Sequence, residues 1–303
     1  MRRAARVAGR LARLALSSTR PPPTPRRVPL VSVITATYNW SSVLRFAIES
    51  VRGQTYPNWE LLVVGDGCTD DSEEVVRSFG DPRIRWTNLP ANSGSQSAPN
   101  NAGLELARGE YVAYHGHDDL WLPGHLASLV DGLQRTGAGI ASTAFQTLGP
   151  PGSNVREIAY LLRTTEFARR STPSSVMHRR ECAAAVGGWR DYRELVEPPD
   201  RDLIGRVAAA YGSAFVPVLT VWKLNSAMRR NSYVERRSDE QAALAARMRR
   251  ERLFTLRELA AFASLQLRRP EPHLPEMPAP PAEVPPGWWV TEWRRIRGLE
   301  PPC

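Results

Sequence analysis

Short apolar runs alternate with amphipathic stretches through the first half of the chain. Leu30–Thr37 (LVSVITAT) is an apolar, β-branched run, and the runs at 59–65 (WELLVVG) and 111–115 (YVAYH) have the same character. A helix that Ser41 can cap lies between the first two runs. Strands that alternate with helices predict a parallel sheet, with ligands expected beyond the carboxyl ends of its strands.

The same alternation continues to about residue 225. A helix through Val75 and Phe79 leads to a third strand at 83–88, and a Gly/Ser/Asn loop and another helix precede the run at 111–115. The elements expected in the second half are strands at 139–145, 173–178 and 214–223 and helices at 181–188 and 201–212.

This pattern predicts an α/β fold, with a Rossmann-like, mostly parallel sheet that has helices on both faces. We expect this domain at residues 30–225. Residues 1–29 form a basic N-terminal tail with a Pro-rich linker, because the run STRPPPTPRRVP breaks any helix. Residues 226–303 form a helical and Pro-rich C-terminal appendage.

The net charge of +9 and the pI of 10.1 first suggest a nucleic acid or an anionic surface as partner. Residues 1–27, however, hold eight arginines and no acid, which leaves 32 basic and 31 acidic residues in the rest of the chain. Because the basicity belongs to the tail, we expect no nucleic-acid partner.

The basic tail allows three interpretations. On a helical wheel Val7, Leu11 and Leu14 group apart from the arginines, as in a helix that lies on an anionic membrane surface. The same composition is typical of an organelle transit peptide or a disordered leader.

Three cysteines without a CxxC spacing predict neither a disulfide framework nor a structural zinc site. No run approaches the roughly 20 apolar residues of a spanning helix. We therefore expect a cytoplasmic protein, which the basic tail could bring into peripheral contact with the inner face of the membrane.

The stretch VAYHGHDDLWLPGH at 112–125 places three histidines and two aspartates around the end of a strand. Its His-x-His-x-Asp spacing matches the start of the dinuclear zinc motif of metallo-β-lactamase-type hydrolases. Leu120 stands where that motif requires a further histidine. The remaining ligands of such a site would have to come from His125, His178 and His273, and no supporting motif surrounds them.

Three polar clusters directly follow predicted strands: TYN (37–39), GDGCTDD (65–71) and GHDD (116–119). They should meet in one crevice. In this order and spacing they resemble the nucleotide-diphosphosugar-binding half of an inverting family 2 glycosyltransferase, strongly over 30–145 and more weakly over 163–210. The resemblance implies a GT-A type fold and transfer of a sugar, from a UDP-sugar as first guess, to an acceptor hydroxyl in glycan or polysaccharide biosynthesis. The acceptor could be a glycan, a lipid-linked molecule or a protein.

Such a transfer calls for a divalent cation, magnesium or manganese, that stabilises the charge developing on the diphosphate. Both ions prefer oxygen ligands. Asp118 and Asp119 can supply one metal ligand and one acceptor for the ribose hydroxyls. His115 or His117 is a further candidate ligand or a donor to the diphosphate, because Gly116 stands where the family usually has an acid.

By the same resemblance, Thr37, Tyr38 and Asn39 lie at the nucleotide and Asp66 accepts a hydrogen bond from its base. A turn residue that caps the next helix is the alternative for Asp66.

An inverting transferase also needs a carboxylate that deprotonates the acceptor hydroxyl. In the run VEPPDRDLIGRV at 196–207, Asp200 aligns with the family's usual base, and Asp202 is the second candidate. The alternative for Asp200 is a helix cap. Because Gly116 and Pro199 each replace a usual acid, a catalytically impaired relative that still binds a sugar nucleotide also stays open.

Two basic regions follow. Lys223, the only lysine of the chain, can reach the diphosphate together with Arg229 and Arg230, or these residues form a solvated basic face. The tryptophans of GWWVTEWRRIRG at 287–298 lie beside arginines. We favour packing of these tryptophans onto the domain over an anchor at a membrane interface.

Overall fold

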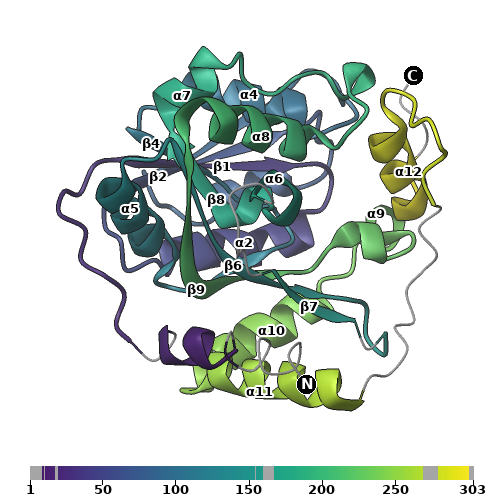
Figure 1. Ribbon diagram of the computed structural model, residues 1–303. Helices are drawn as coiled ribbons and strands as arrows, with labels where there is room; N and C mark the ends of the chain where they lie inside the picture. The colour runs from purple at the N-terminus through teal and green to yellow at the C-terminus, as the bar shows by residue number, and fades with distance from the viewer. Residues whose placement is uncertain are drawn as a thin grey trace.

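A mixed nine-stranded sheet runs through the molecule (Figure 1). It belongs to a computed structural model of the chain that describes residues 9, 11–17, 20–153, 155–159, 167–268 and 279–299. The strands are β1 (Val31–Thr37), β2 (Trp59–Gly65), β3 (Ile84–Asn88), β4 (Tyr111–Tyr114), β5 (Leu120–Trp121), β6 (Ile140–Leu148), β7 (Arg156–Ala159), β8 (Val176–Arg179) and β9 (Ser213–Lys223). Within the described residues their spatial order is β3-β2-β1-β4-β8-β6-β9-β5, and β7 pairs with β6.

The helices cover both faces of this sheet. They are α2 (Ser41–Arg52), α3 (Ser72–Arg77), α4 (Ser97–Leu106), α5 (His125–Thr136), α6 (Phe167–Arg170), α7 (Arg180–Ala185), α8 (Pro199–Tyr211), α9 (Ser232–Glu235), α10 (Asp239–Arg250), α11 (Phe254–Arg268) and α12 (Trp288–Arg297). Apolar side chains of α2, α3 and α5 pack on one face, and those of α4, α6, α7 and α8 pack on the other. Figure 1 shows α4, α7 and α8 on the opposite side of the sheet from α2. The predicted α/β fold with helices on both faces is confirmed.

The first four strands form the parallel half of the sheet. β1 pairs with β2 and β4, and β2 pairs with β3, all in parallel. Every residue of β2 is buried, as expected for a strand that is covered on both faces. In the second half, β8 runs antiparallel to both β4 and β6, whereas β9 returns parallel to β6. The register places Thr37, Gly65 and Asn88 at the same edge, so the loops that follow these strands meet there.

The helix predicted at Ser41 begins at that residue, but the predicted cap is wrong. The Ser41 side chain makes no capping hydrogen bond. Its backbone N–H instead donates to Asp70 Oδ2 at 3.1 Å. Asp70, from the loop after β2, also accepts from Ser72 Oγ at 2.6 Å. A side chain distant in sequence therefore takes the role of the cap, and this contact ties the loop after β2 to the start of α2.

A third apolar cluster joins the tail and the C-terminal segment to the sheet. Leu14, from the helical residues 11–17, is 1% exposed and packs in a cluster with Trp222 of β9 and Phe254 of α11. The apolar side on which the membrane interpretation depends is thus covered by protein at this residue, and Val7 lies outside the described residues. Among the helices that the structure describes, none is both long and apolar enough to cross a bilayer. The domain boundaries at 29/30 and 225/226 stay predictions.

Candidate active site

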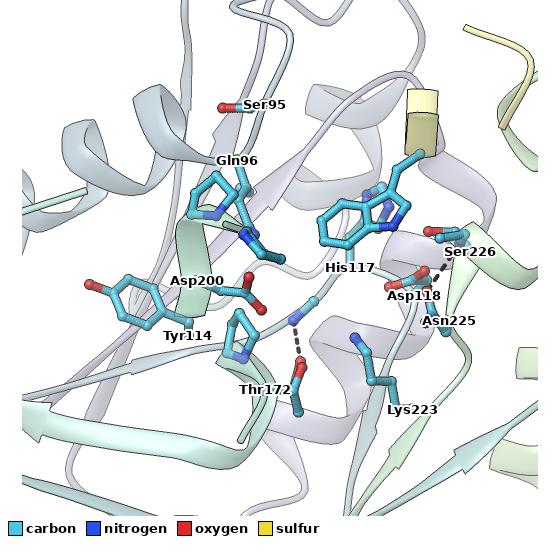
Figure 2. Close-up of a pocket in the computed structure, with 18 of the residues that line it drawn as sticks. Ser95, Gln96, Tyr114, His117, Asp118, Thr172, Asp200, Lys223, Asn225 and Ser226 are labelled. Carbon is cyan, nitrogen blue, oxygen red and sulfur yellow. Dashed lines mark hydrogen bonds between the residues drawn. The ribbon is translucent and has the colours of Figure 1, made fainter. Parts of the chain in front are cut away.

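A cavity of about 1020 Å³ opens where β1, β2 and β4 end at their carboxyl ends. The predicted site residues that line it are Thr37, Tyr38, Asp66, His117, Asp118 and Asp200, and Lys223 joins them. Figure 2 shows His117, Asp118, Asp200 and Lys223 around one space. The remaining three predicted residues, Asn39, Asp119 and Asp202, are not part of this wall.

Asp66 is held by the Gly/Ser/Asn loop that precedes α4. Its carboxylate accepts hydrogen bonds from the Ser93 backbone N–H and from Asn92 Nδ2, both at 2.9 Å. Burial raises the pKa of Asp66 above its ordinary value, although these hydrogen bonds oppose the shift. The residue before α3 is Asp71, so Asp66 is not the cap of that helix. The carboxyl group of Asp66 therefore faces the cavity in a fixed orientation.

The residues after β1 have different surroundings. Thr37 Oγ1 lies 2.8 Å from His117 Nδ1, and Tyr38 stacks on Tyr233 with ring centroids 6.5 Å apart. Asn39 has a positive φ of 44°, and its Oδ1 accepts from the Thr69 backbone N–H at 2.7 Å. Asn39 thus shapes the turn after β1, whereas Thr37 and Tyr38 face the cavity.

His117 uses both of its ring nitrogens within the protein. Nδ1 pairs with Thr37 Oγ1, and Nε2 lies 3.0 Å from the Tyr233 hydroxyl. Burial lowers the pKa of His117, which favours the neutral imidazole. A neutral imidazole offers one donor and one acceptor, so a metal bound at His117 would have to displace one of these two hydroxyl partners.

Asp118 and Asp119 are neighbours with different environments. The Asp118 side chain faces the cavity, while Asp119 is 0% exposed and accepts from Ser174 Oγ at 2.5 Å and from the Leu224 backbone N–H at 3.1 Å. Lys223 Nζ lies 3.4 Å from Asp119 Oδ2. Burial raises the pKa of Asp119 to about 6. For Asp118, burial alone would raise the pKa, but the interactions with His117, Lys223 and Arg297 outweigh it and lower the pKa, so this carboxylate is ionised.

The carboxylates of Asp118 and Asp119 fill the space beside the Cα atom of Gly116. A Cβ atom at this position would lie 2.9 Å from Asp119 Oδ2 and 3.3 Å from Asp118 Oδ1. Its backbone N–H donates to Ser174 Oγ at 2.9 Å. A side chain at residue 116 would therefore require its neighbours to move, which gives a physical reason for the glycine.

The donor set fits a cation that shares its ligands with a substrate. Throughout the described part of the chain, no group of three or more His, Cys, Asp or Glu side chains could hold a metal ion. Asp118 is the carboxylate of the Asp118–Asp119 pair that faces the cavity. Magnesium commonly keeps several waters and is held by one or two carboxylates together with substrate phosphates. Asp118 and a bound diphosphate would supply that kind of site.

Asp200 lies in the first turn of α8 and faces the same cavity. Its Oδ1 atom is buried and has no hydrogen-bond partner among the described residues, and α8 has no side-chain cap. Burial raises the pKa of Asp200. Asp202 points elsewhere, because its carboxylate pairs with Arg206 at 2.6 Å and Arg190 at 3.5 Å. The arrangement leaves Asp200 open to accept a proton from a bound molecule, whereas Asp202 joins α8 to the preceding segment.

Several residues of the site could not be assigned a role from the sequence. Ser174 supports Gly116 and Asp119, and Tyr233 contacts His117. The loop of Asn92 was visible in the sequence only as a loop. Arg229 does not reach the cavity, because its guanidinium binds Glu240 at 2.6 Å and the Gly149 carbonyl at 3.1 Å.

The other described histidines are His115, His125 and His178. His115 lines the cavity, and its Nε2 atom lies 3.4 Å from Ser50 Oγ. His125 Nδ1 lies 2.8 Å from Thr220 Oγ1, and His178 Nε2 lies 3.1 Å from the Tyr114 hydroxyl. Burial lowers the pKa of both imidazoles. His273, the third candidate for a zinc site, lies outside the described residues. The geometry does not gather His125 and His178 beside His117.

The sequence matches one protein family over half of its length. Residues 32–186 match the family described as glycosyl transferase family 2. TuaG of Bacillus subtilis (strain 168), a glycosyltransferase assigned to teichuronic acid biosynthesis, is 33% identical over 127 residues, which are 41% of this chain and 50% of TuaG. WfgD of Escherichia coli, a UDP-Glc:alpha-D-GlcNAc-diphosphoundecaprenol beta-1,3-glucosyltransferase, is 38% identical over 97 residues, 32% of this chain and 38% of WfgD. The chain thus spans half or less of the length of these relatives.

A solved structure supports the fold. The mannosyltransferase PcManGT from Pyrobaculum calidifontis, in complex with GDP-Man and Mn2+, superposes with a TM-score of 0.54 over 87% of this chain and 79% of that protein. The two sequences are 20% identical. This likeness shows a shared GT-A architecture.

Proposed function

The chain belongs to glycosyl transferase family 2, and from this premise we propose that it transfers a sugar from a nucleotide diphosphosugar to an acceptor hydroxyl with inversion. A UDP-sugar is the first donor to test, because WfgD is a UDP-Glc transferase. The acceptor class, a glycan, a lipid-linked molecule or a protein, stays undetermined. A cytoplasmic location stays a prediction, and peripheral contact with the membrane stays a prediction from the basic tail.

The observation that carries this proposal is the convergence of three of the predicted carboxylates on one cavity. Asp66, Asp118 and Asp200 come from the ends of β2 and β4 and from the start of α8, and all three line the same space. Their environments differ: Asp66 is hydrogen-bonded by a loop, Asp118 is ionised beside positive charges, and Asp200 has a buried oxygen without a partner. Environments that separate the pKa values of neighbouring acids are typical of catalytic sites.

In the proposed mechanism Asp66 binds the nucleotide base, between Thr37 and Tyr38. Asp118 binds the ribose or the divalent cation, magnesium or manganese. That cation would supply positive charge for the departing diphosphate. Asp200 accepts the proton of the acceptor hydroxyl while the oxygen of that hydroxyl forms a bond to the anomeric carbon. The bond from that carbon to the diphosphate oxygen breaks on the opposite side, and a nucleoside diphosphate leaves.

The direct test is a thermal-shift panel of UDP, GDP, CDP and dTDP, each with manganese and each without it. We expect one nucleotide to raise the melting temperature, because a ligand that binds only the folded state stabilises it by RT ln(1 + [L]/Kd). The shift should be larger with manganese. If none of the four stabilises the protein, the proposed function is wrong.

A further inference from the structure

The C-terminal helix α12 forms one wall of the cavity, although the family match ends at residue 186. Its cavity-lining residues are Val290, Trp293, Arg294 and Arg297, followed by Leu299. Figure 1 shows α12 beside α9, at the end of the molecule away from α5. A segment that lies beyond the matched region therefore contributes to the site that the family motifs define.

Backbone contacts hold α12 at both ends. At its start the Gly287 N–H donates to the Leu195 carbonyl at 2.9 Å, and near its end the Ile296 carbonyl accepts from the Asn231 N–H at 2.8 Å. Val290 and Ile296 are buried. The inner side of the helix is thus fixed toward the cavity.

Arg294 connects α12 to the loop that holds Asp66. Its guanidinium donates to the Gly94 carbonyl at 3.1 Å and to Asn92 Oδ1 at 3.4 Å, and the side chain is 9% exposed. Asn92 is itself a hydrogen-bond donor to the Asp66 carboxylate. Arg294 is therefore a positioning residue for the loop behind Asp66.

Arg297 is a cation without an acidic partner in the part of the chain that the structure describes. Its guanidinium carbon lies 5.7 Å from the centroid of the Tyr233 ring, and its Nε atom is buried with no hydrogen-bond partner among those residues. Arg295, two residues earlier, points away and pairs with Glu292 at 2.8 Å. Arg297 as a whole is half-buried, and a guanidinium without an ion pair at the wall of a cavity is suited to bind an anion from outside the protein.

The charges of the cavity indicate which anion that is. The carboxylates that line it are Asp66, Asp118, Glu157 and Asp200, and the cations are Arg169, Arg201, Lys223, Arg294 and Arg297. A carboxylate or phosphate that binds among these acids needs positive charge nearby. Lys223 is already 3.4 Å from Asp119. Arginine presents a planar fork of N–H donors that matches two phosphate oxygens at once. The positive charge of Arg297 acts on the same space as Asp118, whose ionised form it favours.

We propose that α12 is part of the donor site and that Arg297 binds the diphosphate of the nucleotide donor. The proposal rests on the proposed transferase function, and it adds a binding residue from outside the matched family region. The nucleoside part of the donor would contact Asp66 and Tyr38.

The test compares R297M with R295M, which removes the same charge from the outer side of the same helix. For the nucleoside diphosphate that stabilises the wild type most, the affinities of the diphosphate and of its free nucleoside are measured by calorimetry. Loss of a charge-assisted hydrogen bond weakens binding by about 10- to 100-fold. We expect R297M to lose that much affinity for the diphosphate and none for the nucleoside, and R295M to bind both as the wild type does.

The outcomes separate the two proposals. If no nucleoside diphosphate binds the wild type, the proposed function fails first. If the wild type binds one and R297M binds it within about twofold of R295M, Arg297 does not hold the diphosphate and this inference is wrong. Where R297M does not fold in a thermal melt, R297Q replaces it under the same criteria.

Discussion

A methyl group at residue 116 tests whether the space beside Asp118 and Asp119 is as full as the structure indicates. In Gly116→Ala the new Cβ would lie 2.9 Å from Asp119 Oδ2 and 3.1 Å from Ser174 Oγ. Asp119 cannot easily withdraw, because Ser174 and the Leu224 backbone N–H hold its carboxylate at 2.5 Å and 3.1 Å. Overpacking of a filled site costs about 1–3 kcal/mol, and we expect that loss in the free energy of unfolding.

Urea unfolding followed by circular dichroism gives the measurement, and Gly205→Ala is the matched control. Gly205 lies within α8, where a Cβ would meet Ala168 Cβ at 3.5 Å, an ordinary contact. Replacing a helical glycine by alanine at a compatible position stabilises by about 0.4–1 kcal/mol. If Gly116→Ala unfolds at the same urea concentration as Gly205→Ala, the steric account of Gly116 is refuted.

The acid that the family motif usually has at this position extends the test. Gly116→Asp adds the same Cβ and a third carboxylate beside Asp118 and Asp119. Like charges repel when ionised, so the loss of stability should exceed that of Gly116→Ala and should be larger at pH 8 than at pH 5. A Gly116→Asp protein that is as stable as the wild type would contradict this reasoning.

Three further predictions follow from the same contacts. Burial raises the pKa of Asp200 above the ordinary 3.8, so a base at this position loses its charge at a higher pH than a free carboxyl does. We therefore expect kcat/KM to fall as the pH drops through that raised pKa. A pH–rate profile with a midpoint at or below 3.8 would contradict this prediction. Asp118→Asn should abolish the effect of manganese on nucleotide affinity, because Asp118 faces the cavity. Asp119→Asn should leave the manganese effect in place, because the Asp119 carboxylate is buried against Ser174 and Lys223. Calorimetry with and without manganese compares the two variants, and equal effects of both on metal dependence would contradict the division of roles. Leu14→Ala should lower the free energy of unfolding in urea by about 2–3 kcal/mol, because Leu14 is buried in the cluster that joins the tail to the sheet. An unchanged free energy of unfolding would contradict this packing of the tail.

The parallel half of the fold could be predicted because its signals are local. The apolar, β-branched runs of β1 and β2 and the polar residues after them need no knowledge of distant contacts. The same holds for Asp66 and Asp118, which follow strands directly and therefore reach the common edge of the sheet. The direction of β8 was not predictable in this way, since a short strand such as Val176–Arg179 looks the same in either orientation.

The division of roles within the site depends on contacts between distant residues. Asp118 and Asp119 are identical in sequence terms, and only Ser174 and Lys223, 55 and 104 residues further along the chain, separate the cavity-facing carboxylate from the buried one. Asp70 replaces the predicted Ser41 cap for the same reason. Arg297 could not be assigned from its pattern, because only the folded chain shows that no described carboxylate forms an ion pair with it.

Turnover of Asp200→Asn tests most directly whether Asp200 is the base of a sugar transfer. Release of nucleoside diphosphate is measured for wild type and variant with the donor whose nucleotide stabilises the protein, with water as the acceptor, and nucleotide affinity is measured beside it. General base catalysis contributes about 10²- to 10⁴-fold, so Asp200→Asn should lose that much turnover and keep the nucleotide affinity of the wild type. Unchanged turnover in this variant would contradict the account.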